Sequence, residues 1–337
     1  MAIGRLADEV QTALSAAEDT SATAAERAEM LMEIAMGLQH RPKTPDQLQA
    51  AVELYDKALA LCPDREALLR GRITARKGTA LQAMPGGGAA SLERARAALE
   101  EAIPILRDLG RPEELAEAEI NFGVVVQSLA AAGLARITDA IAAYQRALRT
   151  FDRRRHPKEF AILQNNLATA FLSIPFTDER AKMREALAVQ AFEEALKVVD
   201  LIDHPSEYAM LQNNLGNALQ YASSSHTVEN NLRALDAYGE ALRVRRRDTA
   251  PLEYANTIAN KANCLWNLPD QPDHPERGNR ANLAQAKACY AEAREIFMAK
   301  GEHERARIVA EAATQIEREL LALAPSNQMD ALAEASS

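Results

Sequence analysis

Six copies of one short pattern, spaced at nearly constant distances, constrain the fold of this chain more than any other feature. Each copy has an alanine, a large side chain four positions later, and a second alanine three positions after that. This spacing puts all three side chains on one face of a helix. A period of 44 to 52 residues is typical of helical repeat proteins, in which neighbouring units bury one another's apolar faces. The second alanines are Ala58, Ala102, Ala147, Ala195, Ala241 and Ala293.

A first helix precedes this pattern in each unit. Residues 205–219 carry apolar side chains at three- and four-residue steps, which form a single apolar stripe. Similar stretches begin at Pro112, Pro157 and Pro251. A Ser-rich break at 223–225 separates the 205–219 helix from the next one, so each unit is predicted to be a helical hairpin. The stripe residues are Tyr208, Leu211, Leu215 and Leu219.

Composition and charge narrow the possible partners. The 337-residue chain is 47% hydrophobic but only 4% aromatic, so its core is built mainly from Ala and Leu. Its net charge of −9 argues against a nucleic-acid backbone as the main partner. No apolar run approaches the roughly 18 residues of a membrane-spanning helix. Residues 1–9 lack the apolar segment of a signal peptide. We therefore expect a cytoplasmic protein that binds neither nucleic acid nor membrane.

These patterns predict an all-α fold, a right-handed α-solenoid of helical hairpins with a capping helix at each end. We expect an N-terminal capping helix in 1–22 and a C-terminal capping helix in 301–323 that shields the last apolar face. Residues 324–337 are predicted to be a disordered tail. The six predicted repeats within 23–300 cover 23–61, 64–109, 112–152, 157–201, 205–247 and 251–300.

The repeats resemble the tetratricopeptide repeat (TPR). That family carries a Leu-Gly pair in its first helix, here Leu215-Gly216, and an Ala-aromatic-Ala pattern in its second, here Ala234, Tyr238 and Ala241. These units are longer than the family's usual unit of about 34 residues. The form Pro-x-Glu-Tyr/Phe-Ala-x-Leu-Gln-Asn-Asn-Leu is most similar to bacterial repeats beside CHAT peptidase domains and to those of kinesin light chains. No peptidase domain is present, so that closer resemblance concerns only the scaffold.

Asparagines recur at one equivalent place in four predicted first helices, although asparagine is a mediocre helix former. The first helices of tetratricopeptide proteins line a concave groove, and the resemblance implies that these side chains bind the backbone of an extended peptide. An amide suits this task because it offers one acceptor and two donors. The alternative is that the amides bond to neighbouring helices or to water. The equivalent residues are Asn121, Asn166, Asn214 and Asn260, with Asn165, Asn213, Asn217 and Asn263 beside them.

Other side chains extend the candidate groove. Trp266 is the only tryptophan, and an exposed ring there would be a binding hot spot, whereas a buried ring would be part of the core. Arg72 and Arg76 occupy groove positions nearer the N-terminus and are candidates for contact with an acidic end of a ligand. A solvated charged helix face is the alternative. Arg153–Arg155 and Arg245–Arg247 end second helices, where cations interact favourably with the helix dipole; an RNA or acidic-partner patch is the alternative.

The sequence carries no catalytic or metal-binding pattern. Cys62, Cys264 and Cys289 have no paired spacing, and no histidine lies three or four residues from a cysteine or a second histidine. No Gly-x-Ser-x-Gly, phosphate-loop or dinucleotide motif occurs. We therefore expect no catalysis, no metal and no cofactor.

The sequence thus predicts a non-catalytic adaptor, sensor or chaperone that binds a peptide or protein segment in its groove. The alternative is a structural scaffold that forms homo-oligomers through its convex face or its ends. An accessible asparagine row favours the first function, and an uncovered apolar patch at one end favours the second. The ligand and the oligomeric state are left open.

Overall fold

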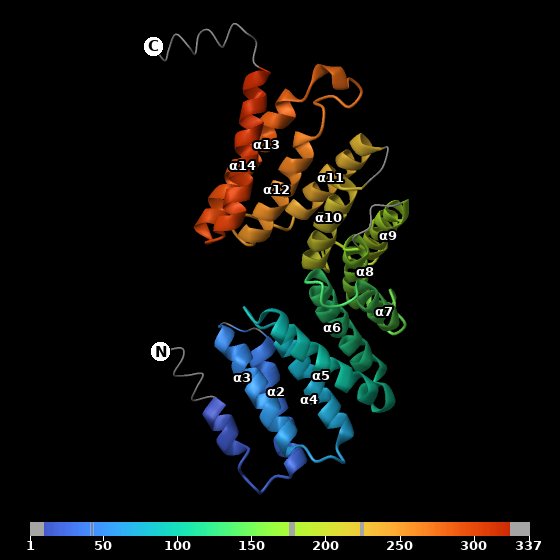
Figure 1. Ribbon diagram of the computed structural model, residues 1–337, viewed down its shortest axis with the longest axis vertical. Coiled ribbons are helices and arrows are strands. Elements are labelled where there is room, and N and C mark those ends of the chain that lie inside the picture. The colour runs from blue at the N-terminus through green and yellow to red at the C-terminus, as the bar shows by residue number, and fades with distance from the viewer. Residues whose placement is uncertain (1–9, 41, 43, 175–178, 223–225, 324–337) are drawn as a thin grey trace. The chain divides into compact units, whose positions relative to one another are not determined.

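The protein is described by a computed structural model that covers residues 10–40, 42, 44–174, 179–222 and 226–323 (Figure 1). The regular elements of these residues are all helical, which confirms the predicted all-α fold. The chain divides into two compact units, which we call unit 1, up to residue 174, and unit 2, from residue 175. The predicted tail, 324–337, and the first nine residues of the predicted N-terminal capping helix lie outside the described residues.

Unit 1 consists of successive helical hairpins. Helix α2 packs against α3, α4 against α5, and α6 against α7, while α5 and α7 also contact the helix that follows each of them (Figure 1). Residues 10–16 are helical as well, and Ala13 and Ala17 are buried in the first apolar cluster. The helices are α2 (Ala24–His40), α3 (Pro45–Leu61), α4 (Ala67–Gln82), α5 (Gly88–Leu109), α6 (Pro112–Ala131), α7 (Ile137–Ala147) and α8 (Pro157–Leu172).

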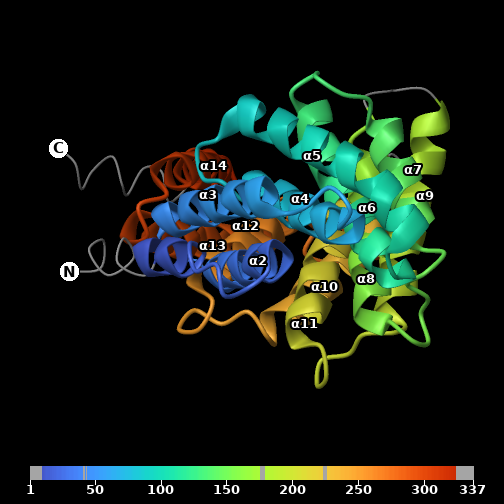
Figure 2. The same cartoon turned by 90° about the horizontal axis from the view of Figure 1, so that it is seen from below.

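Unit 2 continues in the same way. Helix α10 packs against α11, and α13 packs against both α12 and α14. Figures 1 and 2 show α12, α13 and α14 side by side. Helix α14 buries Ala306, Val309 and Ile316 against the apolar cluster of α12 and α13; its role as a cap stays a prediction. The elements are α9 (Glu179–Leu196), α10 (Pro205–Gln220), α11 (Thr227–Leu242), α12 (Pro251–Trp266), the short 3₁₀ helix η1 (Pro275–Arg277), α13 (Arg280–Ala299) and α14 (His303–Ala322).

Four of the first helices begin at a proline. Proline suits the first helical position because its fixed φ fits the helix, and the N–H that it lacks would have no partner within the helix. These residues are Pro112, Pro157, Pro205 and Pro251, the prolines from which the sequence pattern begins.

The alanine pattern forms the core of the hairpins. The rings of Tyr144, Phe192 and Tyr238 are fully buried, and the patterned alanines beside them are buried as well. Gly216 lies directly against the ring of Tyr238, because a Cβ added to it would lie 2.6 Å from Tyr238 Cε1. Gly123 has the same relation to Tyr144. These glycines allow the two helices of each hairpin to approach closely.

In three hairpins a tyrosine of the second helix donates a hydrogen bond to a glutamine of the first. The pairs are Tyr55 with Gln39, Tyr144 with Gln127 and Tyr238 with Gln220, at 2.8, 2.9 and 2.8 Å. The hairpin α4–α5 has Leu99 in place of the tyrosine, and Oε1 of its glutamine, Gln82, is buried without a partner among the described residues.

Replacing Gln82 with leucine is therefore expected to stabilise unit 1 by about 1 kcal/mol, because a buried acceptor without a hydrogen bond is removed. The matched control, Gln127→Leu, should do the opposite, since it leaves the Tyr144 hydroxyl without its acceptor. Urea unfolding followed by circular dichroism measures both. A loss of stability in both variants would contradict this interpretation of Gln82.

Candidate functional site

Asn213 on α10 joins the two first helices of unit 2. It is only 7% exposed, and its Oδ1 lies 3.1 Å from Thr257 Oγ1 and 3.3 Å from Asn260 Nδ2, both on α12. Its own Nδ2 donates to Asn214 Oδ1 at 3.3 Å. Asn213 thus has the contacts of the alternative prediction, in which the amides tie neighbouring repeats together.

Asn217 on α10 and Asn263 on α12 each contact the hydroxyl of a tyrosine. The Tyr238 hydroxyl on α11 lies 2.7 Å from Asn217 Oδ1 and 2.8 Å from Gln220 Oε1, so its single hydrogen is shared between the two acceptors. Asn263 Nδ2 donates to the hydroxyl of Tyr221 at 2.8 Å, from α12 to the residue that follows α10. An amide has one acceptor and two donors, and each of these contacts uses one of them.

Two aromatic side chains lie at the C-terminal ends of α10 and α12. The ring of Tyr221 is 68% exposed although its hydroxyl is anchored by Asn263. Trp266 is half-buried against the α12–α13 cluster, and its Nε1 donates to Glu319 on α14 at 2.8 Å. Trp266 is therefore neither a fully exposed hot spot nor a fully buried core residue.

The asparagines of unit 1 also contact their neighbours. Asn121 on α6 donates to Thr79 Oγ1 on α4 at 3.1 Å. On α8, the buried Asn165 donates to Asn166 Oδ1 at 3.3 Å. In both units, then, amides of the first helices make hydrogen bonds to nearby polar side chains, and most of these side chains remain partly exposed.

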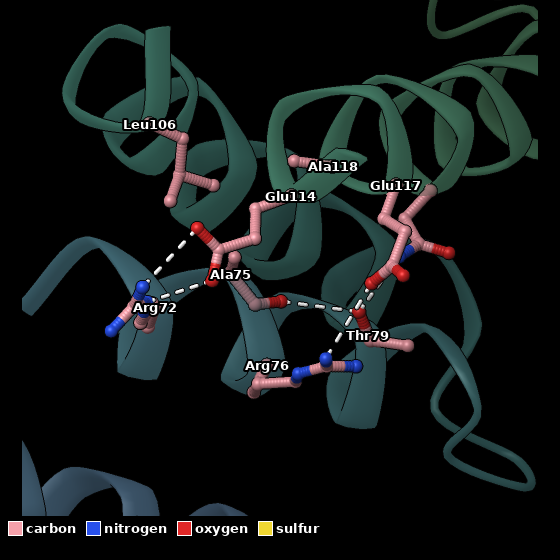
Figure 3. Close-up of a pocket in the computed structure, with 9 residues that line it drawn as sticks. Arg72, Ala75, Arg76, Thr79, Leu106, Glu114, Glu117 and Ala118 are labelled. Carbon is pink, nitrogen blue, oxygen red and sulfur yellow. Dashed lines mark hydrogen bonds and ion pairs between the residues drawn. The ribbon is translucent and has the colours of Figure 1, made fainter. Parts of the chain in front are cut away.

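Arg72 and Arg76 on α4 face two glutamates on α6 (Figure 3). Arg72 Nε lies 2.8 Å from Glu114 Oε1, and Arg76 Nη2 lies 3.5 Å from Glu117 Oε2. Burial by itself raises the pKa of Glu114, but hydrogen bonds from the Arg111 N–H and from Arg72 lower this pKa below its usual value. An acidic ligand at this place would have to compete with two carboxylates.

The sequence does not predict two polar residues, Thr257 and Arg245, that contact each other beside Asn213. Helix α11 ends at Leu242, so Arg245 lies beyond it, and its Nη1 donates to Thr257 Oγ1 at 2.9 Å. Arg247 instead pairs with Glu295 at 2.7 Å. In the other five repeats, the residue at the position of Arg245 is apolar. This difference is the sequence signal that identifies Arg245 as an exception.

The three cysteines are poor nucleophiles because burial raises the pKa of each thiol. The pKa of Cys264 is raised to about 12, and its Sγ donates to the backbone oxygen of Asn231 at 3.0 Å. We expect the folded protein to react slowly with a thiol reagent at mildly alkaline pH, whereas the unfolded chain should expose three fast-reacting thiols. Rapid labelling of the native protein, counted by absorbance, would be the contrary result.

Within the described ranges, no group of three or more His, Cys, Asp or Glu side chains is arranged to hold a metal ion. Similarly, none of the helices in this part of the chain is long and apolar enough to cross a membrane.

No protein-family model matches the chain, and no curated protein does. Among solved structures, it is similar to the Rap protein complexed with the Competence and Sporulation Factor (12% identity, TM-score 0.46, 87% of this chain and 76% of that one). It is also similar to the Rap conjugation gene regulator of plasmid pLS20 in complex with the Phr* peptide (17%, 0.47, 89% and 77%). A third is the TPR2AB-domain:pHSP90 complex of yeast Sti1 (16%, 0.31, 87% and 99%).

Proposed function

We propose that this protein is a non-catalytic adaptor, sensor or chaperone that binds an extended segment of a peptide or protein along its first helices. In unit 2 the contacting side chains would be Asn217, Tyr221, Asn260 and Asn263, with Trp266 at the edge. The amides would bind the backbone of the ligand, since an amide side chain matches the donor and acceptor of a peptide group.

The observation that carries this proposal is the exposed, anchored ring of Tyr221. A large aromatic ring that is 68% exposed is accessible to a partner. The hydrogen bond from Asn263 anchors the Tyr221 hydroxyl, so the side chain loses less conformational entropy when a partner binds. Rigid tyrosines surrounded by polar groups are typical centres of protein interfaces.

The proposal is tested by selecting random-sequence peptides displayed on phage against the wild-type protein. Tyr221→Ala is expected to weaken binding of a selected peptide by at least about tenfold, the effect of a modest hot spot. Folding should change little, because most of the ring is exposed.

The control is Ile202→Ala, which removes a side chain that is 87% exposed in the turn before α10, at the opposite end of that helix from Tyr221. It should leave the affinity unchanged. Selection that enriches no sequence, or equal affinities of the wild type and Tyr221→Ala, would contradict the proposed function.

We further propose that the protein acts in the cytoplasm and that its repeats are of the long bacterial type similar to CHAT-associated and kinesin-light-chain repeats. The lack of a spanning helix in the described residues is compatible with the first statement. The Asn-Asn pairs at 165–166 and 213–214 support the second.

A further inference from the structure

Helix α2 carries a carboxylate at the position where the first helices α6, α8, α10 and α12 carry the equivalent asparagines. The glutamine that bonds to the tyrosine of its hairpin fixes the register, because Asn121 stands six positions before Gln127. The same step back from Gln39 of α2 leads to Glu33. One turn earlier, the same helix face carries Glu29. The row proposed to contact a ligand therefore begins with two acidic residues.

Glu29 and Glu33 line a cavity of about 260 Å³ in unit 1. Met32 and Met36 of α2 line it as well, and its other walls come from α4 and from the start of α6. Pockets that hold a whole small ligand have volumes of about 300–1,000 Å³. This cavity is smaller, so it suits one side chain of a longer ligand.

The cavity adjoins the asparagine row. Arg72, Arg76 and Glu114 line both this cavity and a second, smaller one (Figure 3), which Asn121 also lines. A chain whose backbone is bound at Asn121 can therefore place a neighbouring side chain in the larger cavity.

The three arginines of the larger cavity already have carboxylate partners. Arg72 donates two hydrogen bonds to Glu114, at 2.8 and 3.3 Å, and Arg111 lies 3.6 Å from the same carboxylate. Arg76 lies 3.5 Å from Glu117 (Figure 3). An anion that entered the cavity would have to displace these carboxylates from the arginines.

Glu29 and Glu33 differ from the arginines in this respect. Both side chains are exposed, and neither makes an ion pair or a hydrogen bond within the part of the chain that the structure describes. A carboxylate only accepts hydrogen bonds, so both are open to a ligand that donates them. The charge that this cavity leaves unbalanced is negative.

We infer that the cavity is a subsite for a lysine or arginine side chain of the bound segment, an inference that rests on the proposed function. The cationic group would donate hydrogen bonds to Glu29 and Glu33. Its alkyl part would pack on the thioethers of Met32 and Met36, since long basic side chains bury their methylene groups against apolar surface. This ligand charge is opposite to the one predicted from the arginines of α4 alone.

The inference is tested with two pools of random hexapeptides that carry either lysine or norleucine at the third position. Norleucine keeps the alkyl chain but lacks the charge. Binding is followed in NMR spectra of the full-length protein labelled with ¹³C at its methionine methyl groups. The lysine pool should shift the signals of Met32 and Met36 at about tenfold lower concentration than the norleucine pool, as expected for two exposed ion pairs. Equal concentrations would overturn the inference.

A double variant, Glu29→Gln with Glu33→Gln, should remove the difference between the pools and leave the fold intact, because both side chains are exposed. The matched control is Glu53→Gln with Glu101→Gln, which removes two exposed carboxylates from α3 and α5 and should preserve the difference. This control is needed because a net charge of −9 attracts any cationic peptide. A difference that disappears in both double variants would contradict a specific subsite.

The signal of Met210 distinguishes failure of this inference from failure of the proposed function. Met210 lies on α10, one turn before Asn214 of the asparagine row. If the pools shift the signal of Met210 but neither that of Met32 nor that of Met36, the subsite is absent although the proposed function stands. If no methionine signal shifts with either pool at millimolar concentration, the proposed function fails and the inference fails with it.

Discussion

Replacing Arg146 with methionine is expected to destabilise unit 1 by roughly 3 kcal/mol, because it leaves a buried carboxylate without its main partner. Glu119 on α6 is 2% exposed and receives two hydrogen bonds from Arg146 on α7, at 2.8 and 2.6 Å. The remaining cation, Arg107 on α5, lies 3.9 Å away and is half-exposed. The shift of the urea unfolding midpoint measures the loss.

The control is Arg149→Met, a change of an exposed arginine just beyond the same helix, which should have almost no effect. A second variant, with Arg146→Met and Glu119→Gln together, should recover much of the lost stability because no buried charge remains. If the double variant is as unstable as Arg146→Met, then lost packing, and not the unpaired carboxylate, explains the effect.

Gly216→Ala is expected to destabilise unit 2 by about 1–3 kcal/mol, the usual range for forcing an extra methyl group into a packed core. Its Cβ would lie 2.6 Å from Tyr238 Cε1, and the ring is fully buried, so ring or helix has to move. The higher helix propensity of alanine offsets only part of this cost.

Gly239→Ala is the matched control, since it lies in α11, one residue after Tyr238, and a Cβ there would meet no atom within 4 Å. It should stabilise the unit by about 0.5–1 kcal/mol through helix propensity alone. Thermal unfolding of the two variants distinguishes the effects. If both substitutions stabilise unit 2, Gly216 is not required for close packing against Tyr238.

The hairpins could be predicted from the sequence because the core of each one depends on local periodicity. The spacing of Ala234, Tyr238 and Ala241 on one helix face is a property of the helix itself, and all three are buried. The prolines at 112, 157, 205 and 251 stand where the helices begin, since the preference of proline for that position is also local.

The bonding of the site could not be predicted in the same way, because it depends on which helices are neighbours in space. The sequence placed Asn213 beside the row but could not show that Thr257, 44 positions later, lies against it. The sequence favours an interaction of Arg245 with the dipole of a second helix, whereas its guanidinium donates to Thr257 on α12. Likewise, the pairing of Arg72 with Glu114 joins residues 42 positions apart.

The most direct test of the proposed function is the double variant Asn217→Ala, Asn260→Ala, measured for both affinity and melting temperature. Each internal partner keeps another bond: the Tyr238 hydroxyl keeps Gln220, and Asn213 keeps Thr257. We therefore expect a small drop in melting temperature but a loss of affinity for a selected peptide of about tenfold or more, from two lost hydrogen bonds of about 0.5–1.5 kcal/mol each. Unchanged affinity with a clear drop in melting temperature would contradict the proposal and assign these amides to holding the repeats together.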